Sequence, residues 1–498
     1  MTSLFSNLEA QFPPSNTLFA RLDGRDDCTY GDVLAGSAQV ANHLISLGLE
    51  PGDRVAAQVP KSIDALMLYL GAVRAGGVFL PLNTAYTAAE LDYFLTDASP
   101  RVFVSDPAKA HDLAPVADKA GAYMRTIAEF AEAAGKELTQ FETVARDDDD
   151  LAAILYTSGT TGRSKGAMLT HANLWSNAKA LVETWRFTKD DFLIHALPIF
   201  HTHGLFVATH CVLASGSALH LLERFDADRV LDLMAQEAPN PATVLMGVPT
   251  FYTRLLKNDR LPAAAQNMRL FTSGSAPLLA ETHRAFERAT GQRIVERYGM
   301  TETNMNTSNP YDGERRAGTV GAPLPGVELR IMSDSTKVEA GDVGSIQVRG
   351  TNVFKGYWQM LEKTAEEFTQ DGWFITGDLG QMSPDGYLTI VGRDKDMVIT
   401  GGFNVYPVEV EDLIDRLDGV VESAVVGLPH DDFGEAVTAF VVADTPLEEA
   451  AILDSISSSL ARYKQPKRVL FLDELPRNTM GKVQKAALRK ENAKLYSS

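Results

Sequence analysis

The 498-residue sequence has little cysteine and a deficit of positive charge. Its only thiols are Cys28 and Cys211, so a disulfide framework and a zinc site built from several thiolates are excluded, and a reducing cytoplasm fits. The 46 Lys and Arg residues stand against 65 Asp and Glu residues, which gives a net charge of −19. Because such a surface repels phosphate polymers and anionic head groups, we expect neither nucleic acid nor an anionic membrane as a partner.

Long hydrophobic runs are scarce as well. Residues 1–16 lack a basic region followed by an apolar one, so no secretory signal is predicted. Residues 203–222 carry no Asp, Glu, Lys or Arg and approach the length of a membrane span. Three histidines dilute this segment and Gly216 divides it. We therefore predict a buried helix followed by a core strand, and no membrane span.

Between about residues 53 and 300, short apolar runs alternate with helical patterns, such as residues 63–74 behind a candidate Ser62 cap. This alternation predicts parallel sheets flanked by helices. From about residue 317 the pattern changes to strands separated by Gly, Pro and Asp turns, which predicts a small β-rich subdomain.

The sequence therefore predicts an α/β protein with two domains. Residues 1–393 form the large domain, and residues 394–498 form a smaller α+β domain beyond a boundary near 394–396. Charge is also unevenly distributed, because residues 462–498 contain ten Lys and Arg but only three Asp and Glu. The acidic average thus hides a basic C-terminal segment.

The strongest local motif is YTSGTTGRSKG, residues 156–166. Hydroxyls, glycines that let backbone amides turn inward, and one ammonium group together make a donor surface suited to phosphate. These groups belong to Thr157, Ser158, Gly159, Thr160, Thr161, Gly162 and Lys165. The motif is not a Walker A loop, because Gly166 follows the lysine where Ser or Thr is needed. A merely flexible loop is the structural alternative.

This segment resembles the phosphate loop of the acyl-adenylate-forming enzymes, which include acyl-CoA synthetases, peptide-synthetase adenylation domains and luciferases. Further segments resemble other motifs of that family, in the family's order. They are PIFHTHG (198–204), TSGSAPL (272–278), YGMTET (298–303), WFITGDLG (373–380), GRDKDMVITGGFNVYPVEVE (392–411) and PRNTMGKVQK (476–485). The resemblance spans most of the chain and implies a large N-terminal domain with a mobile C-terminal lid.

The resemblance implies a two-step reaction that uses ATP, Mg²⁺ and coenzyme A. A carboxylate attacks the α-phosphate of ATP, pyrophosphate leaves, and the thiol of coenzyme A then takes the acyl group. Since the first step joins two anions, donors and cations must supply much of the acceleration. The catalytic residues so implied are Lys482, Thr301, Glu302, His201 and Lys165.

Individual roles follow from the same resemblance. Lys482 reaches the α-phosphate and the substrate carboxylate, Glu302 holds Mg²⁺, Tyr298 stacks on adenine, and Asp378 with Arg393 holds the ribose. The implied nucleotide-binding set is Thr157, Ser158, Gly159, Thr160, Thr161, Gly162, Lys165, Ser275, Ala276, Pro277, Glu296, Tyr298, Gly299, Met300, Thr301, Asp378, Arg393 and Lys482.

The lid is implied to rotate between the two steps. Lys395 matches the hinge position, and Gly401 and Gly402 match the loop that approaches the pantetheine channel. The family also acylates the lysine at the position of Lys482, which would remove its charge. A protein acetyltransferase and a deacylase are therefore candidate partners.

Arg297, directly before Tyr298, indicates which acid is activated. A buried cation needs a partner, and the second carboxylate of a dicarboxylic acid would supply one. The run IVERYGMTETNMNTSNPYDG also resembles malonyl-CoA synthetases. His201, Ser275 and Arg163 complete the predicted set around the substrate carboxylates. A purely structural alternative is a bridge from Arg297 to Glu296 or Glu302.

Two other interpretations of the histidines stay open. His201 is compatible with an ordinary core histidine. His201 and His203, with His195 or His210, are compatible with a metal site, although no further ligand motif accompanies them. The resemblance to malonyl-CoA synthetases implies a cytoplasmic, ATP-dependent enzyme for malonate, with methylmalonate as a second substrate. The alternatives are a CoA ligase for a monocarboxylic fatty or aryl acid, or a stand-alone adenylation enzyme that loads a carrier protein.

Overall fold

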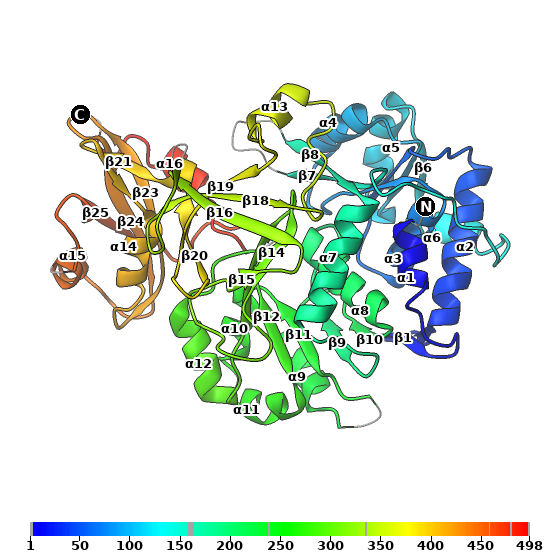
Figure 1. Cartoon of the computed structure of the whole chain (residues 1–498), viewed down its shortest axis with the longest axis horizontal. Helices are drawn as coiled ribbons and strands as arrows, with labels where there is room; N and C mark the ends of the chain where they lie inside the picture. Colours follow the sequence, from blue (N-terminus) through cyan, green and yellow to red (C-terminus); the bar gives the residue numbers. More distant parts are fainter. Residues whose placement is uncertain are drawn as a thin grey trace.

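The computed structural model describes residues 3–157, 164–237, 240–333, 336–457, 459–478 and 481–496. The C-terminal unit, orange to red in Figure 1, lies beside the green elements of the middle of the chain and away from the blue N-terminal helices. Three sheets belong to the larger part of the chain and one to the C-terminal unit.

The first sheet has six strands, of which five are parallel. In spatial order they are β6 (Tyr123–Thr126), β5 (Val102–Ser105), β3 (Arg54–Gln58), β4 (Val78–Pro81), β7 (Leu151–Thr157) and β8 (Lys165–Thr170). Strand β8 is antiparallel to β7. The predicted phosphate loop therefore lies between two paired strands, and α7 begins at His171, after β8.

The second sheet has nine strands with a parallel centre. Their order is β15 (Ala322–Pro323), β14 (Asn304–Ser308), β13 (Val295–Met300), β12 (Leu270–Ser273), β11 (Val244–Gly247), β9 (Phe192–His195), β10 (Ala218–Leu221), β1 (Leu18–Leu22) and β2 (Cys28–Thr29). The carboxyl ends of β9, β12 and β13 lead into the motifs at residues 198–204, 272–278 and 298–303. Parallel strands bring these ends to one edge of a sheet, where ligands bind in such folds.

The third sheet is the predicted β-rich subdomain, and its named strands pair in antiparallel fashion. Its order is β17 (Thr336–Lys337), β16 (Val327–Ser333), β18 (Gly344–Gly350), β19 (Phe374–Met382) and β20 (Leu388–Arg393). The C-terminal unit contains β22 (Phe403–Val405), β21 (Val398–Thr400), β24 (Gly434–Ala443) and β23 (Val420–His430), with β25 (Arg468–Phe471) paired to β24. A short 3₁₀ turn, Asp394–Asp396, lies between the two sheets.

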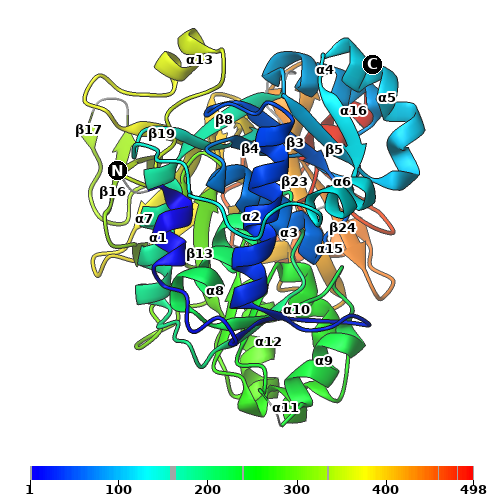
Figure 2. The same cartoon turned by 90° about the vertical axis from the view of Figure 1, so that its right-hand side faces the viewer.

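Local side chains begin and end several helices. Ser62 caps α3 (Ile63–Arg74) by accepting a hydrogen bond from the Ala65 amide, as predicted. The other helices of the larger part are α1 (Leu4–Glu9), α2 (Tyr30–Ser46), α4 (Ala88–Ala98), α5 (Ala110–Lys119), α6 (Ile127–Ala134), α7 (His171–Thr184), α8 (Thr209–Ser215), α9 (Ala227–Ala235), α10 (Pro249–Leu255), α11 (Leu261–Ala264), α12 (Ala280–Thr290) and α13 (Leu361–Glu366). Helices α2 and α3 pack together, and Figure 2 shows both beside α1. The C-terminal unit adds α14 (Pro407–Ile414), α15 (Glu449–Ser457) and α16 (Lys485–Glu491).

The hydrophobic segment 203–222 folds as a buried helical piece followed by a strand. A π-helical turn, His203–Ala208, continues into α8, and β10 follows after Gly216. Gly216 adopts the left-handed conformation, with φ of 68°, and so ends the helix. Within the described residues, none of the helices combines the length and the apolar character that crossing a bilayer requires.

The buried apolar side chains form separate cores. One extends through both parallel sheets and the β-rich subdomain, whereas two clusters lie within the C-terminal unit, around Val425 and Phe440. A unit that packs its own core can keep its internal structure when it moves relative to its neighbour.

Candidate functional site

The predicted ribose-binding pair is already assembled by strand pairing. Asp378 on β19 lies opposite Arg393, the last residue of β20, and their side chains form an ion pair with an Nε–Oδ1 distance of 2.9 Å. The hydroxyl of Tyr298 donates to the other Asp378 oxygen at 2.6 Å. Asp378 thus joins the end of β13 to the β-rich subdomain, and the Tyr298 ring lies beside this carboxylate.

A second network surrounds Glu302 and Lys165. The Tyr357 hydroxyl lies 3.1 Å from Glu302 Oε1 and 2.7 Å from Glu367 Oε2. Lys165 Nζ lies 2.8 Å from Glu367 Oε1 and 4.0 Å from the centre of the Tyr357 ring. Burial raises the pKa of Glu302. For Glu367, burial acts in the same direction, but hydrogen bonds from Lys165 and Tyr357 outweigh it and lower the pKa.

The carboxylate of Glu302 fits the ion that the sequence predicts there. It is 5% exposed, and burial without a full countercharge favours binding of a cation. Carboxylate oxygen is the ligand that the hard Mg²⁺ ion prefers. Glu302 and Glu367, which share the Tyr357 hydroxyl, offer oxygen ligands at this place.

The segment 198–204 forms a tight turn, in which backbone amides bond to groups of His201. The amide of His203 donates to His201 Nδ1 at 3.3 Å, and the amides of Gly204 and Leu205 donate to the His201 carbonyl. A Cβ atom on Gly204 would lie only 2.1 Å from the Pro198 carbonyl oxygen, so this turn requires glycine. Because His201 Nδ1 accepts a hydrogen bond, its Nε2 carries the ring proton. Burial first, then the charges of Arg297 and Lys482, lower the pKa of His201 to about 4.

The other histidines of this region have individual partners. His195 Nδ1 lies 2.8 Å from Lys61 Nζ and its Nε2 lies 3.0 Å from the Gly204 carbonyl. His210 Nε2 lies 2.7 Å from the Tyr69 hydroxyl, and His203 Nδ1 lies 3.2 Å from Ser275 Oγ. Each of these rings thus has a partner of its own, and the described residues hold no group of three or more potential metal ligands.

Arg297 is buried in this region, with 4% of its surface exposed. Its Nε and Nη2 atoms have no hydrogen-bond partner among the described residues. A Cβ atom on Gly274 would lie 2.3 Å from the guanidinium carbon, so the glycine makes the space that Arg297 occupies. Burial lowers the pKa of Arg297 to about 10, which leaves the group charged at neutral pH.

The proposed structural bridges from Arg297 do not form. Glu296 Oε1 lies 2.7 Å from His283 Nδ1 and accepts from the Gly318 amide at 3.2 Å. The side chains of neighbouring strand residues point to opposite faces of the sheet, so Glu296 and Arg297 point away from each other. The carboxylate of Glu302 is held by Tyr357 instead.

Lys482 lies close to the Asp378–Arg393 pair, and burial followed by the charge of Arg393 lowers its pKa to about 8. The neighbouring Gly481 approaches Thr250 of α10, since a Cβ atom on it would lie 3.4 Å from the threonine. Gly401 and Gly402 lie elsewhere, in an exposed two-residue turn between β21 and β22 with φ of 57° and 82°. The lysine is therefore at the site while the glycine turn faces solvent. Lys395 lies in the 3₁₀ turn before β21.

The remaining predicted residues are distributed around these groups. Thr157 ends β7, Thr301 lies in the turn between β13 and β14, and Gly299 and Met300 end β13. Ser275, with a φ of 70°, Ala276 and Pro277 follow β12. The predictions for Ser158, Gly159, Thr160, Thr161, Gly162 and Arg163 fall outside the described residues.

Three groups of the site were not predicted from the sequence. Tyr357 and Glu367 come from the segments before and after α13, and Gly274 leaves the space that the Arg297 guanidinium occupies. His203, considered above only as a metal ligand, lies 3.2 Å from Ser275 Oγ. Of the three unpredicted residues, Gly274 lies within a recognised motif. Tyr357 and Glu367 had no local signal, because long-range folding brings them to Glu302.

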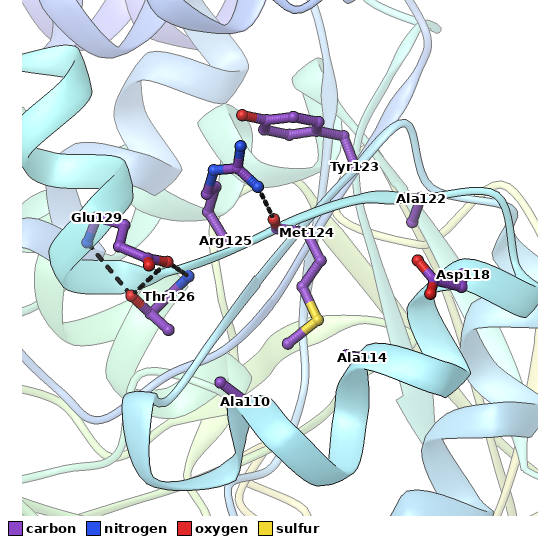
Figure 3. Close-up of a pocket in the computed structure, with 9 residues that line it drawn as sticks. All are labelled: Ala110, Ala114, Asp118, Ala122, Tyr123, Met124, Arg125, Thr126 and Glu129. Atoms are coloured by element: carbon purple, nitrogen blue, oxygen red, sulfur yellow. Dashed lines mark hydrogen bonds between the residues drawn. The ribbon is translucent and has the colours of Figure 1, made fainter.

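A surface pocket of about 420 Å³ lies apart from this site, between α5, β6 and the start of α6 (Figure 3). Its charged lining consists of Asp118, Arg125 and Glu129, and the Arg125 guanidinium lies over the Tyr123 ring at 4.4 Å. None of the motif residues lines it.

Known proteins resemble both parts of the chain. The family described as AMP-binding enzyme matches residues 8–358, and the AMP-binding enzyme C-terminal domain matches residues 409–482. A malonate–CoA ligase of Arabidopsis thaliana is 35% identical over 516 residues, which cover 96% of this chain and 84% of that protein. The ATP-bound structure of MatB from Rhodopseudomonas palustris is 55% identical, with a TM-score of 0.97 over 100% of both chains. The apo structure of the same protein superposes with a TM-score of 0.85, also over 100% of both chains.

Proposed function

The chain belongs to the AMP-binding enzyme family, and from that premise we propose that it is an ATP-dependent malonyl-CoA synthetase. Malonate and ATP give malonyl-AMP and pyrophosphate, and coenzyme A then gives malonyl-CoA and AMP. Methylmalonate is a second substrate in this proposal. The observation that carries the choice of acid is the buried, charged and unpaired guanidinium of Arg297 among the described residues.

A second carboxylate on the substrate would pair with the Arg297 guanidinium. Burying a cation without a partner is unfavourable, and a bidentate carboxylate offsets this free energy with charge-assisted hydrogen bonds. A monocarboxylic fatty or aryl acid would instead place apolar groups against the guanidinium. This difference disfavours the monocarboxylate alternative.

Each residue around the reacting carboxylate has its own role in adenylation, the first step. His201 carries its proton on Nε2 and is neutral near pH 7, so it is a donor that adds no charge. Lys482 supplies a positive charge between the α-phosphate and the attacking oxygen, and Lys165 supplies one at the phosphate loop. Asp378 and Arg393 hold the ribose hydroxyls. Glu302 would hold Mg²⁺, and the ion would supply positive charge against the phosphate oxygens.

For the second step we propose rotation of the lid about residues 394–396, with Lys395 in the hinge. The large domain would be residues 1–393 and the lid residues 394–498. Support comes from the separate cores of the lid and the single 3₁₀ turn between two sheets. Rotation would withdraw Lys482 and bring the exposed turn at Gly401 and Gly402 to the pantetheine of coenzyme A.

Two further points belong to the proposal. Acylation of Lys482 by a protein acetyltransferase, reversed by a deacylase, would stop adenylation by removing the charge. We also propose a cytoplasmic location, which two free, buried thiols support.

Pyrophosphate release with and without coenzyme A, measured over malonate, methylmalonate, succinate, acetate, octanoate and coumarate, tests the function. We expect the highest kcat/KM with malonate or methylmalonate, and thioester formation with coenzyme A. Equal or better rates with octanoate or coumarate would refute the choice of a dicarboxylate. Preference for a carrier protein over coenzyme A as acceptor would favour the stand-alone adenylation enzyme.

A further inference from the structure

Lys482 lies in a short turn that is hydrogen-bonded to itself. Arg477 and Val483 form an antiparallel bridge across this turn. The Asn478 amide donates to the Lys482 carbonyl at 3.0 Å, and the Lys482 amide donates to Asn478 Oδ1, also at 3.0 Å. Because both backbone groups of Lys482 are held, the conformation of the turn decides the direction in which the lysine side chain leaves the backbone.

Arg477 ties this turn to the body of the C-terminal unit. Its Nη1 atom donates to the Gly481 carbonyl at 2.5 Å, and its Nη2 atom is paired with the Glu422 carboxylate on β23. Gly481 has a φ of 75°, in the left-handed region that favours glycine. One guanidinium therefore joins the residue directly before Lys482 to a strand of the C-terminal sheet.

Glu422 is the carboxylate that holds Arg477. Both side chains are partly buried, with 24% of Glu422 and 29% of Arg477 exposed. Burial raises the pKa of Glu422, and the charge of Arg477 opposes that rise. A second carboxylate, Glu411 of α14, accepts instead from Lys485 Nζ and from the Val425 amide, both at 2.6 Å. The ion pair between Glu422 and Arg477 is thus a fixed connection between β23 and the turn.

The position of the lysine side chain matters because it lies among charged groups. The Lys482 ammonium group is close enough to Arg393 and Asp378 for their charges to act on it. A catalytic group that is displaced by about 1 Å loses about 10²-fold in rate. A change in the shape of the turn would therefore reach the reaction directly.

We propose that Arg477 is a positioning residue for adenylation: through the Gly481 carbonyl it directs the Lys482 ammonium group at the reacting groups. Glu422 keeps the guanidinium in place. The inference rests on the proposed function, in which Lys482 acts in the first step only. Since Arg477, Glu422 and Lys482 all belong to the C-terminal unit, the ion pair turns with the lid and has no part in the second step. The expected signature is a loss that is confined to adenylation and depends on Lys482.

Four variants test this role. Arg477→Met keeps the length of the side chain but removes its charge and its donors, Arg477→Lys keeps the charge, and Glu422→Gln removes the countercharge. Arg468→Met is the matched control, because Arg468 on β25 forms an ion pair with Glu449 of α15 at 3.0 Å in the same unit. Three quantities are measured for each protein: malonate-dependent pyrophosphate release, transfer of malonyl groups from supplied malonyl-AMP to coenzyme A, and the melting temperature.

Arg477→Met should lower kcat for pyrophosphate release by about 10- to 100-fold, because the lysine is no longer held in place. Transfer from malonyl-AMP should change by less than about threefold, and Arg468→Met should leave both steps unchanged. Arg477→Lys should recover part of the loss, and Glu422→Gln should lose less than Arg477→Met. In a Lys482→Ala background, Arg477→Met should have little further effect, because its effect passes through the lysine.

Equal losses in the two steps of Arg477→Met, or the full loss again in the Lys482→Ala background, would overturn the positioning role and identify the ion pair as structural. Unchanged pyrophosphate release in Arg477→Met would overturn it as well. If Arg477→Met does not fold, Arg477→Lys and Glu422→Gln decide between the same outcomes. Wild-type protein that releases no pyrophosphate with malonate would instead contradict the proposed function, which none of the variant results does.

Discussion

The proposed nucleotide side and the proposed acyl side of the site differ in how their charged groups are paired. On the nucleotide side, Asp378 pairs with Arg393 and Glu367 pairs with Lys165. On the acyl side, Arg297 has no carboxylate partner among the described residues, and the nearest candidates are committed to His283 and Tyr357. On the first side the protein pairs Asp378 and Glu367 itself and leaves Glu302 for a cation, whereas on the second side Arg297 is left for an anion.

This difference explains how one fold can serve many acids. Paired charges keep the nucleotide side in shape before ATP arrives, which lowers the cost of reorganisation. In the proposed function, the buried and unpaired cation favours an acid whose second carboxylate pairs with it, because any other acid leaves the buried charge without a partner. In the proposed function, specificity then depends on few residues, chiefly Arg297.

Lys482 stands between the two sides, and its removal should have the largest effect. Lys482→Ala should lower malonate-dependent pyrophosphate release by about 10²- to 10³-fold, because loss of one preorganised donor to a developing charge has that magnitude. Transfer of malonyl groups from supplied malonyl-AMP to coenzyme A should fall less than tenfold. Equal loss in both half-reactions would show that the lysine is not specific to adenylation.

Asp378→Asn breaks the pairing on the nucleotide side. We expect kcat/KM for ATP to fall by about 10- to 100-fold, since hydrogen bonds to a charged group are lost at the ribose and at Arg393. The KM for malonate should not change. Steady-state kinetics with each substrate varied in turn will show this, and a parallel rise in the KM for malonate would mean that the two sides are not separable.

The pH dependence of adenylation should be the smallest of the three effects. Lys482 has a pKa of about 8 in the free enzyme, so its ammonium group is charged below that pH and loses its proton above it. Between pH 7 and pH 9, kcat/KM for ATP should therefore fall by about tenfold.

Lys482→Arg provides the control for this pH profile, because a guanidinium stays charged across the range. For this variant, kcat/KM for ATP should not change with pH until the pH approaches the pKa of Arg297, which is about 10. An alkaline fall near pH 8 that persists in Lys482→Arg would assign the profile to another group.

Much of the secondary structure could be predicted from the sequence. Helical periodicity predicted α3, and the order of the motifs singled out Asp378, Arg393 and Glu302, which the structure brings near one another. The strand β8, between the phosphate loop and α7, was not predicted. The short run before α7 had no periodicity of its own, and its pairing with β7 decides its conformation.

What the sequence could not provide were relations between distant residues. Whether Arg297 was bridged to Glu296 depended on which face each side chain took and on His283, 13 positions earlier than Glu296. Likewise, the Tyr357 hydroxyl reaches both Glu302 and Glu367 only because the segment before α13 pairs with β8 and bonds to the turn after β13. Unsatisfied buried atoms, such as His203 Nε2, are visible only once every neighbour is known.

Thermal unfolding of the wild-type protein and Arg297→Met, each with and without malonate in the presence of a non-hydrolysable ATP analogue, tests the central claim most directly. Without malonate, the free energy of unfolding of the variant should equal that of the wild type or be higher by up to about 4 kcal/mol. The reason is that an apolar side chain has replaced an unpaired buried charge. Malonate should raise the melting temperature of the wild type and leave that of the variant unchanged. A less stable variant that malonate still stabilises as much as the wild type would contradict the claim that Arg297 awaits the second carboxylate.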